Sequence, residues 1–395
     1  MAAGEPRARR KRKDKPTLTE QVEASAERVI ERRPPIDTSI LIPSGSTLLN
    51  CACSDNPHGA FALGRIVTLP GGSVGGKTML ALTMMAECAV DSRFDKYDLI
   101  YDDGEEALAM DIPYLFGNKF NERIKPPKTN EEGESVHSET IQDFKANILN
   151  RCTPKTKKID NEWIEILPKP FIYVLDSLDS LTTDEELKKE YAKAIAKATS
   201  AEAVKELKGS YKTEKAKHLG EAIRMINGML KKTKSALFLV QQIRDKIGVT
   251  FGKQTTTSGG HAPFFYSTHQ VWFTKLKNHT RTIKSFKRKI GSHTQAEVTK
   301  NKITGKMRDI EFDIYYDYGI DDVTSCVNFL IQAGHWKKRK ETIVAHDLDL
   351  EAGKSGLVKS IEENRLERKL QVIIGQVWNE VEETLLLDRS RRFGK

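Results

Sequence analysis

Short apolar runs separated by longer segments of helical character are the dominant pattern along the chain. Helix-forming residues follow the first run at 79–90, and a Lys-, Ala- and Glu-rich stretch broken near Gly209 precedes the fourth. Strands that alternate with helices predict an α/β fold with a mainly parallel sheet covered by helices. The four runs have the length and β-branched or aromatic content of buried strands and occupy residues 66–69, 99–101, 171–175 and 236–240.

The pattern changes after the fourth run. Residues 243–260 are weakly apolar and rich in Thr and Gly, and a loop of this length in a compact domain is usually functional or mobile. It therefore either contacts a ligand or is a flexible surface loop. Residues 121–169 are polar and indicate an insertion around one helix at 140–149. Two further strands are expected at 296–303 and 310–316.

Changes of composition predict four parts. Residues 1–16 form a basic tail, which either keeps the protein in solution or binds nucleic acid. Residues 17–39 form a small helical segment that ends at Pro34 and Pro35. A core domain at 40–320 and a C-terminal lobe and tail at 321–395 follow, the lobe with helical patterns at 323–333 and 356–385.

Composition narrows the class of protein. The chain of 395 residues is 38% hydrophobic, enough for a sizeable core, yet no apolar run reaches the roughly 18 residues of a membrane-spanning helix. Five scattered cysteines indicate reduced thiols and a cytoplasmic protein. Cys51 and Cys53 lack the second pair of a zinc site, which favours a structural role. The net charge of +9 fits a polyanionic partner.

The clearest chemical motif matches G-x-x-x-x-G-K-[ST], the phosphate-binding loop, between a predicted strand and a predicted helix. Its glycines let backbone N–H groups approach phosphate oxygens, and the helix N-terminus adds partial positive charge. Lys77 is expected to contact the β- and γ-phosphates, and Thr78 to bind Mg²⁺. A turn without a ligand is the alternative, which the flanking elements disfavour. The motif consists of Gly71, Gly72, Ser73, Val74, Gly75, Gly76, Lys77 and Thr78.

Polar residues follow each of the other predicted strands. Asp176 ends the third strand in a Walker B pattern and is expected to hold the Mg²⁺ shell through water or Thr78. Glu105 and Gln242 follow the second and fourth strands. Because the carboxyl ends of parallel strands lie at one edge, these side chains are expected to converge on a nucleotide there.

A basic stretch at residues 275–289 contains seven Lys or Arg residues and no acid. Either it is a solvated hairpin or a ribbon that faces DNA.

The segment that follows the fourth strand resembles the second DNA-binding loop of the bacterial RecA recombinase family, with matching spacing. The phosphate loop, residues 103–108, residues 175–177 and residues 300–302 fall in that family's order, and the similarity covers about residues 40–340. The matching DNA-loop residues are Arg244, Lys246, Gly248, Phe251, Thr256, Thr257, Gly259 and Gly260.

The resemblance implies roles for individual residues. Glu105 resembles the carboxylate that activates the attacking water, and Gln242 the γ-phosphate sensor. Lys300 and Lys302 resemble a pair that reaches a neighbouring subunit's γ-phosphate. Tyr114 and Tyr316 resemble the residues that flank the adenine, and a first DNA loop is expected within residues 181–215.

The function implied is an ATP- and Mg²⁺-dependent recombinase that forms helical filaments on single-stranded DNA and exchanges strands with double-stranded DNA. Two alternatives stay open: a filament or mediator protein with weak ATP turnover, and a ring helicase of the same superfamily. No membrane contact is expected.

Several departures from the family indicate a diverged member, for which a phage source is one candidate. Gly72, Ser73 and Val74 stand where the family usually has Pro, Glu and Ser. The coupling between ATP and DNA is the property that these changes affect most. The other departures are Gln241 in place of Asn, Pro263 and Phe264 after the DNA loop, expanded segments at 121–169 and 183–215, and a basic C-terminus.

Overall fold

A computed structural model describes residues 36–159, 162–198, 211–245, 255–257 and 259–389. The predicted basic tail, nearly all of the predicted N-terminal helical segment and the break near Gly209 lie outside these residues. The described residues from Thr38 onward belong to one compact unit.

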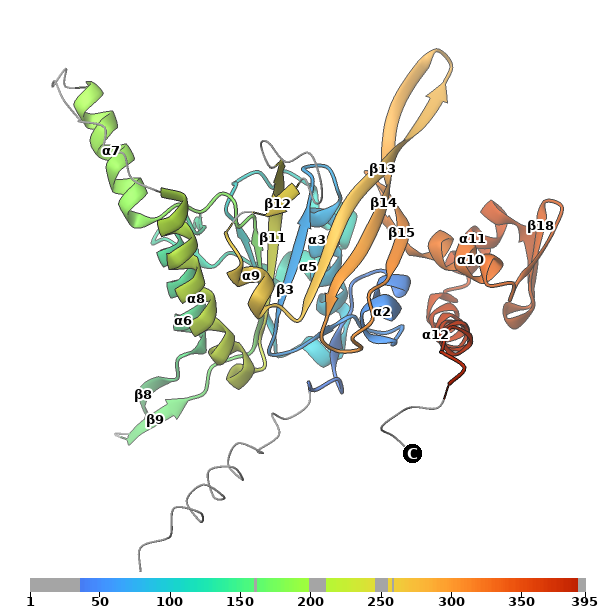
Figure 1. Ribbon diagram of the computed structural model, residues 1–395, viewed down its shortest axis with the longest axis horizontal. Helices are drawn as coiled ribbons and strands as arrows, with labels where there is room; N and C mark the ends of the chain where they lie inside the picture. The colour runs from blue at the N-terminus through green and yellow to red at the C-terminus, as the bar shows by residue number, and fades with distance from the viewer. Residues whose placement is uncertain (1–35, 160–161, 199–210, 246–254, 258, 390–395) are drawn as a thin grey trace, which may run out of the picture. The chain divides into compact units, whose positions relative to one another are not determined.

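A large mixed sheet is the centre of the fold (Figure 1). Its strand order is β16-β15-β14-β13-β3-β11-β10-β4-β5, and β12 pairs with β11. Strands β5, β4, β10, β11, β3 and β13 are parallel to their neighbours, whereas β13 to β16 pair antiparallel. The predicted α/β fold with a mainly parallel sheet is therefore confirmed. The strands are β3 Ile66–Gly71, β4 Asp98–Asp103, β5 Ile124–Lys125, β10 Phe171–Asp176, β11 Ala236–Asp245, β12 Thr255–Thr257, β13 His269–Ile283, β14 Phe286–Asn301, β15 Asp309–Tyr315 and β16 Gly319–Asp321.

Helices cover the sheet because alternate strand residues are apolar on both faces. In β10, Ile172 and Val174 belong to one buried cluster, whereas Tyr173 and Leu175 belong to another. The first cluster includes α2 Thr47–Ser54, α3 Lys77–Val90, α10 Asp322–Gln332 and α12 Glu367–Thr384. The second includes α6 Ile141–Cys152 and α8 Tyr211–Thr233, and α7 Asp184–Ala198 precedes α8 along the chain.

The segment 121–169 holds more structure than the single helix predicted. That helix is α6, which Thr140 caps through a reciprocal capping box with Asp143. Two hairpins accompany it, and their short, polar strands carry no alternating apolar pattern that sequence could have revealed. The neighbouring elements are η1 Ser92–Phe94, α4 Ile112–Phe116, α5 Asn118–Arg123, β6 Lys128–Thr129, β7 Ser135–Val136, β8 Lys155–Ile159 and β9 Glu162–Ile166.

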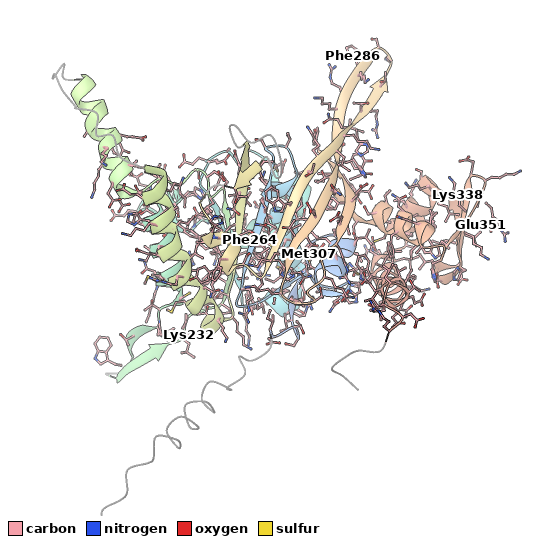
Figure 2. All side chains as sticks on the ribbon, viewed as in Figure 1. Lys232, Phe264, Phe286, Met307, Lys338 and Glu351 are labelled. Atoms are coloured by element: carbon pink, nitrogen blue, oxygen red, sulfur yellow. The ribbon has the colours of Figure 1, made fainter. Side chains whose placement is uncertain are left out.

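The β13–β14 hairpin is much longer than the strand predicted at 296–303. Its last part, residues 280–283 and 286–289, extends beyond the end of β15 and pairs only within the hairpin (Figure 1). Phe286 lies at this outer end (Figure 2). The basic stretch of the sequence is therefore the outer half of a two-stranded ribbon.

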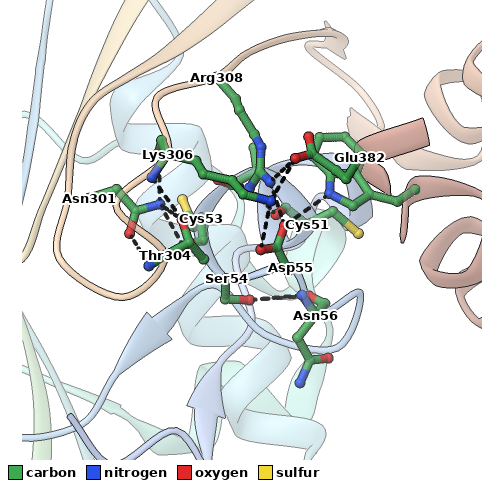
Figure 3. A network of polar contacts seen from close by, with 12 residues as sticks. Cys51, Cys53, Ser54, Asp55, Asn56, Asn301, Thr304, Lys306, Arg308 and Glu382 are labelled. Carbon is green, nitrogen blue, oxygen red and sulfur yellow. Dashed lines mark hydrogen bonds and ion pairs between the residues drawn. The ribbon is translucent and has the colours of Figure 1, made fainter. Parts of the chain in front are cut away.

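The C-terminal part contains a small antiparallel sheet that the sequence did not predict, and the helical pattern at 356–385 is two helices, α11 and α12. An ion-pair network ties α12 to α2 (Figure 3). Arg308 contacts Asp55 and Glu382, each at 2.6 Å, and Lys306 contacts Glu382 at 2.7 Å. The remaining elements are β1 Leu41–Ile42, β2 Phe61–Ala62, α9 Ala262–Tyr266, β17 Lys337–Arg339, β18 Thr342–Ala345, η2 His346–Leu348, β19 Leu350–Gly353 and α11 Lys354–Glu363.

Within the part of the chain that the structure describes, no helix is both long and apolar enough to cross a membrane.

Candidate nucleotide-binding site

The phosphate loop joins β3 to α3 and requires glycine for two physical reasons. A Cβ on Gly71 would lie 2.6 Å from the carbonyl oxygen of Phe273, closer than real contacts allow. Gly76 has a φ of 86°, and its Cβ would lie 2.3 Å from Cδ1 of Ile314. The loop is thus packed closely against β13 and β15 by backbone that carries no side chain.

Lys77 begins α3 and is buried. Its ammonium donates hydrogen bonds to the carbonyl oxygens of Gly71 at 2.9 Å and Gly72 at 2.6 Å. Burial lowers the pKa of Lys77, although the nearby carboxylates of Asp176 and Glu105 act in the opposite direction. An anionic phosphate would compensate the buried charge more strongly than neutral carbonyl groups do.

Thr78 and Asp176 form the oxygen-rich part of the site. The Thr78 hydroxyl donates to Oδ2 of Asp176 at 2.6 Å, and the Tyr101 hydroxyl donates to the same oxygen at 3.0 Å. Burial raises the pKa of Asp176 above its usual value, and these two hydroxyl groups offset the increase only in part. A hydroxyl and a carboxylate held together are ligands that Mg²⁺ accepts, and a bound cation would favour the ionised carboxylate.

Glu105 and Gln242 are joined directly at the carboxyl edge of the sheet. Oε1 of Glu105 accepts a hydrogen bond from Nε2 of Gln242 at 2.8 Å and another from the Ser177 hydroxyl at 2.5 Å. The backbone N–H of Gln242 donates to Asp179 at 2.7 Å. The predicted convergence of residues after the parallel strands is therefore observed, and a carboxylate is held in a fixed position beside the phosphate loop.

A cleft of about 290 Å³ connects these groups. Lys77, Thr78, Glu105 and Asp176 line it, and Tyr316 forms part of its wall. Tyr316 is 53% exposed, and its contact with adenine stays a prediction. Tyr114 lies on α4, is 69% exposed and is not among the residues that line the cleft. Its contact with adenine stays a prediction.

Comparison with known proteins agrees with this geometry. Residues 174–321 match the RecA N-terminal domain family. The chain is 26% identical to Protein RecA of Caldanaerobacter subterraneus subsp. tengcongensis over 353 residues, which cover 86% of each chain. It is 27% identical to Protein RecA of Corynebacterium glutamicum (strain R), over 85% of this chain and 75% of the relative. For Protein RecA of Thermus thermophilus the identity is 25%, over 82% of this chain and 81% of the relative.

Along most of its length the chain is similar to RecA proteins, as a diverged relative, and its central part matches that family's N-terminal domain. In the segment that resembles a DNA-binding loop, β11 continues past Gln242 to Asp245 and pairs antiparallel with β12. Arg244 lies opposite Thr256 in this ladder, and Ile243 opposite Thr257. Lys246, Gly248 and Phe251 lie outside the described residues, as do residues 199–210 of the segment 181–215 that was expected to hold the first DNA loop.

Two glycines of the expected DNA loop have backbone conformations that favour glycine. Gly259 has a φ of 84°, and Gly260 has a φ of 71°. A Cβ on Gly259 would also lie 2.5 Å from Cδ2 of Leu219. The chain therefore turns sharply where it leaves β12 and approaches α8 closely.

Lys300 lies at the end of β14 and Lys302 directly after it, and neither is among the residues that line the nucleotide cleft of the same chain. The Lys300 ammonium donates to the carbonyl oxygens of Phe264 and Phe265, and it lies 4.4 Å from the centre of the Phe264 ring. Burial and the charge of Lys302 lower the pKa of Lys300 to about 8. Lys302 is exposed. The pair is thus available to a second molecule only if Lys300 leaves these carbonyl groups.

Sequence reasoning missed the residues that hold the catalytic candidates in place. Tyr101 looked like an ordinary apolar strand residue, and nothing in its pattern marks a hydroxyl that contacts Asp176. Ser177 and Asp179 follow the Walker B strand, where position alone could have suggested them. Their contacts depend on how the chain turns after β10, which sequence does not specify.

Proposed function

We propose that this protein is an ATP-dependent DNA recombinase that forms a helical filament on single-stranded DNA and promotes pairing and strand exchange with a duplex. The observation that carries the proposal is the hydrogen bond between Glu105 and Gln242. It joins a carboxylate of the nucleotide cleft to the strand that leads into the segment resembling a DNA-binding loop.

Each residue of the cleft has a distinct task in this proposal. Lys77 and the backbone N–H groups of the loop hold the phosphates, and Thr78 and Asp176 hold Mg²⁺, which neutralises charge on the phosphates when bound. Glu105 orients the attacking water and accepts its proton. Because the Gln242 amide donates to Oε1 of Glu105, a γ-phosphate that attracts this amide would leave that oxygen with Ser177 as its donor and shift β11 and β12.

This coupling is tested with Gln242→Ala. We expect ATP to bind nearly as in the wild type, while single-stranded DNA no longer stimulates hydrolysis, because the amide that links the two sites is gone. The matched control is Gln332→Ala, which removes an exposed amide on α10. Full DNA stimulation in Gln242→Ala would contradict the proposed link.

The wider function is tested by electron microscopy and by strand exchange with the full chain, ATP, Mg²⁺ and single-stranded DNA. Helical filaments and exchanged strands are expected. Rings would support the helicase alternative, and filaments without exchange would support the mediator alternative.

One observation favours the mediator with weak turnover. Lys300 already donates to two carbonyl groups of its own chain, so its use by a neighbouring subunit requires those hydrogen bonds to break. Slow hydrolysis on otherwise regular filaments is the expected sign of this second candidate.

A further inference from the structure

Two imidazoles and two carboxylates form a cluster on the antiparallel strands. His279 lies on β13, His293 on β14, and Glu311 and Asp313 on β15. Nε2 of His279 is 2.7 Å from Oδ1 of Asp313, and Nδ1 of His293 is 2.5 Å from the same oxygen. Nε2 of His293 is 2.8 Å from Oε2 of Glu311. These four side chains are called the histidine cluster below.

The histidine cluster lies on the face of the sheet opposite the nucleotide cleft. His293 pairs with Asp313 across β14 and β15, and their neighbours Ser292 and Ile314 pair one position away. Ser292 and Ile314 line the nucleotide cleft. Because successive strand residues point to opposite faces, the cluster is a separate site behind the wall of that cleft.

The number of donors and lone pairs on His293 shows that the histidine cluster requires an additional positive charge, either a proton or a metal ion. A neutral imidazole has one N–H donor and one lone pair, yet both ring nitrogens of His293 face a carboxylate oxygen. If Nε2 donates to Glu311, the lone pair of Nδ1 faces Asp313 at 2.5 Å. Two electron-rich atoms so close repel unless a proton or a metal ion lies between them.

The surrounding charge and the available space favour a metal ion. Asp313 also pairs across the sheet with Asp321, which adds a third acid to this region. The ligand atoms of His279, His293 and Asp313 all lie within 4.8 Å of one another. Tetrahedral Zn²⁺ needs ligand atoms about 3.4 Å apart, so the distances from the two imidazole nitrogens to Oδ1 of Asp313 would open by less than about 1 Å. Their side chains are 19–22% exposed, which leaves a route from solvent.

We propose that His279, His293 and Asp313 bind a divalent transition-metal ion of the Zn²⁺ type. Two imidazoles suit Zn²⁺, Co²⁺ or Ni²⁺, whereas Mg²⁺ takes oxygen ligands almost exclusively. Glu311 is the positioning residue, because its carboxylate accepts the Nε2 proton of His293 and leaves Nδ1 free to bind the metal. The His279 ring stacks on Tyr315, with ring centres 5.3 Å apart, which limits its rotation.

The site would join three strands at the root of the basic ribbon. The β14–β15 pairing ends at Gly291 and Tyr315, immediately beside the histidine cluster. Beyond that point the hairpin has no further strand partner among the described residues. A metal ion there would fix the direction of the ribbon while leaving the nucleotide cleft on the other face open.

A second group of potential ligands, His335, His346 and Asp347, supplies the control. Oδ2 of Asp347 already accepts from Trp336 at 2.8 Å and His335 at 2.9 Å, so its hydrogen bonds are satisfied by ordinary donors. The His346 side chain is 57% exposed, which leaves it less fixed than the imidazoles on β13 and β14.

The test uses the full chain after treatment with a zinc-selective chelator and removal of the chelate. Calorimetric titration with Zn²⁺ in excess Mg²⁺ should show one tight equivalent that His279→Gln/His293→Gln lacks and His335→Gln/His346→Gln retains. Titration with Co²⁺ should give the visible absorption of an ordered site in wild type and in the control. Glu311→Gln should weaken Zn²⁺ binding about 10- to 100-fold without removing the site.

Circular dichroism establishes that each variant is folded, and the conservative Glu311→Gln keeps the test valid if the double variant is not. Equal Zn²⁺ binding by wild type and by both the double variant and Glu311→Gln would overturn the proposal. So would loss of the tight equivalent in the control alone. Absence of Zn²⁺ binding by the wild type would also overturn the proposal when nitrogen NMR shows His293 protonated on both ring nitrogens. That result would assign the positive charge of the cluster to a proton.

Discussion

The two halves of the central sheet use the same type of element in opposite ways. In the parallel half, β3 and β10 are buried along their whole length, and chemistry is confined to the residues that follow each strand. In the antiparallel half, β13 is buried only near its start and becomes exposed toward its end. One half concentrates function at an edge, and the other distributes charged residues along its faces.

The two halves of the sheet contribute different residues to the candidate nucleotide site. The side chains expected to bind the nucleotide come from the parallel half, where Thr78 contacts Asp176 and Glu105 contacts Gln242. Lys77 lines the same cleft as Thr78, Asp176 and Glu105. The antiparallel half contributes Ser292, Ile314 and Tyr316 to the cleft wall and carries the basic ribbon. The polar groups of the candidate nucleotide site therefore come from the parallel half, and variants in the two halves should have separable effects.

The largest effect is expected from Lys77→Ala, which removes the buried ammonium of the phosphate loop. We expect ATP turnover to fall by about 10³-fold or more, because no other described cation lines the cleft. The control is Lys96→Ala, an exposed lysine on the loop before β4. Undiminished DNA-stimulated hydrolysis in purified Lys77→Ala protein would exclude this site.

Glu105→Gln comes next, because it preserves shape and removes the group that accepts a proton. Turnover should fall about 10²-fold or more while ATP binding, measured by fluorescent-nucleotide titration, stays nearly unchanged. Long-lived filaments are expected as a result. The adjacent Glu106→Gln is the matched control, since Glu106 does not line the cleft. If Glu106→Gln is the slow variant instead, the base has been assigned to the wrong carboxylate.

The sequence predicted the parallel half well for two reasons. Its strands are short apolar runs, and the candidate site residues come directly after the strands. It described the antiparallel half poorly because lysine and threonine occupy both faces of the hairpin, which conceals the alternation of a strand. The basic stretch at 275–289 was interpreted as a hairpin or a ribbon, but only the inner part of β14 was predicted as a strand, and the bounds of β13 were not predicted. The strands β17 to β19 are three or four residues long, too short for a detectable period. The histidine cluster depends on strand register, which no local pattern shows.

A smaller effect is expected from changing Lys300 and Lys302 together to alanine. This double variant tests whether the antiparallel half of one subunit contributes lysines to the nucleotide site in the parallel half of its neighbour. ATP binding should persist, DNA-stimulated turnover should fall about 10- to 100-fold, and extended filaments should become less stable. Changing the exposed Lys337 and Lys338 of β17 to alanine is the control of equal charge.

Mixing the Lys300/Lys302 double variant with Lys77→Ala protein sharpens this prediction. One protein supplies an intact phosphate loop and the other supplies intact lysines, so mixed interfaces should recover some turnover. No recovery at any ratio, with assembly of the two proteins shown independently, would argue against catalysis across the interface. Full activity of the double variant on its own would contradict a role for these lysines in catalysis across the interface.

The smallest effect concerns the ribbon, and it decides between a DNA-facing element and a solvated hairpin. Changing Lys284, Lys287 and Arg288 together to glutamine should leave ATP binding intact and modestly weaken DNA affinity. Each lost phosphate contact should reduce the slope of log affinity against log salt by about 0.9 on duplex DNA. The control changes Lys337, Lys338 and Arg339 of β17 to glutamine, the same loss of three charges on another exposed strand. Because both variants alter net charge equally, only a direct contact can make their salt slopes differ. Equal slopes would identify the ribbon as a solvated hairpin and leave DNA binding to the segment after β11.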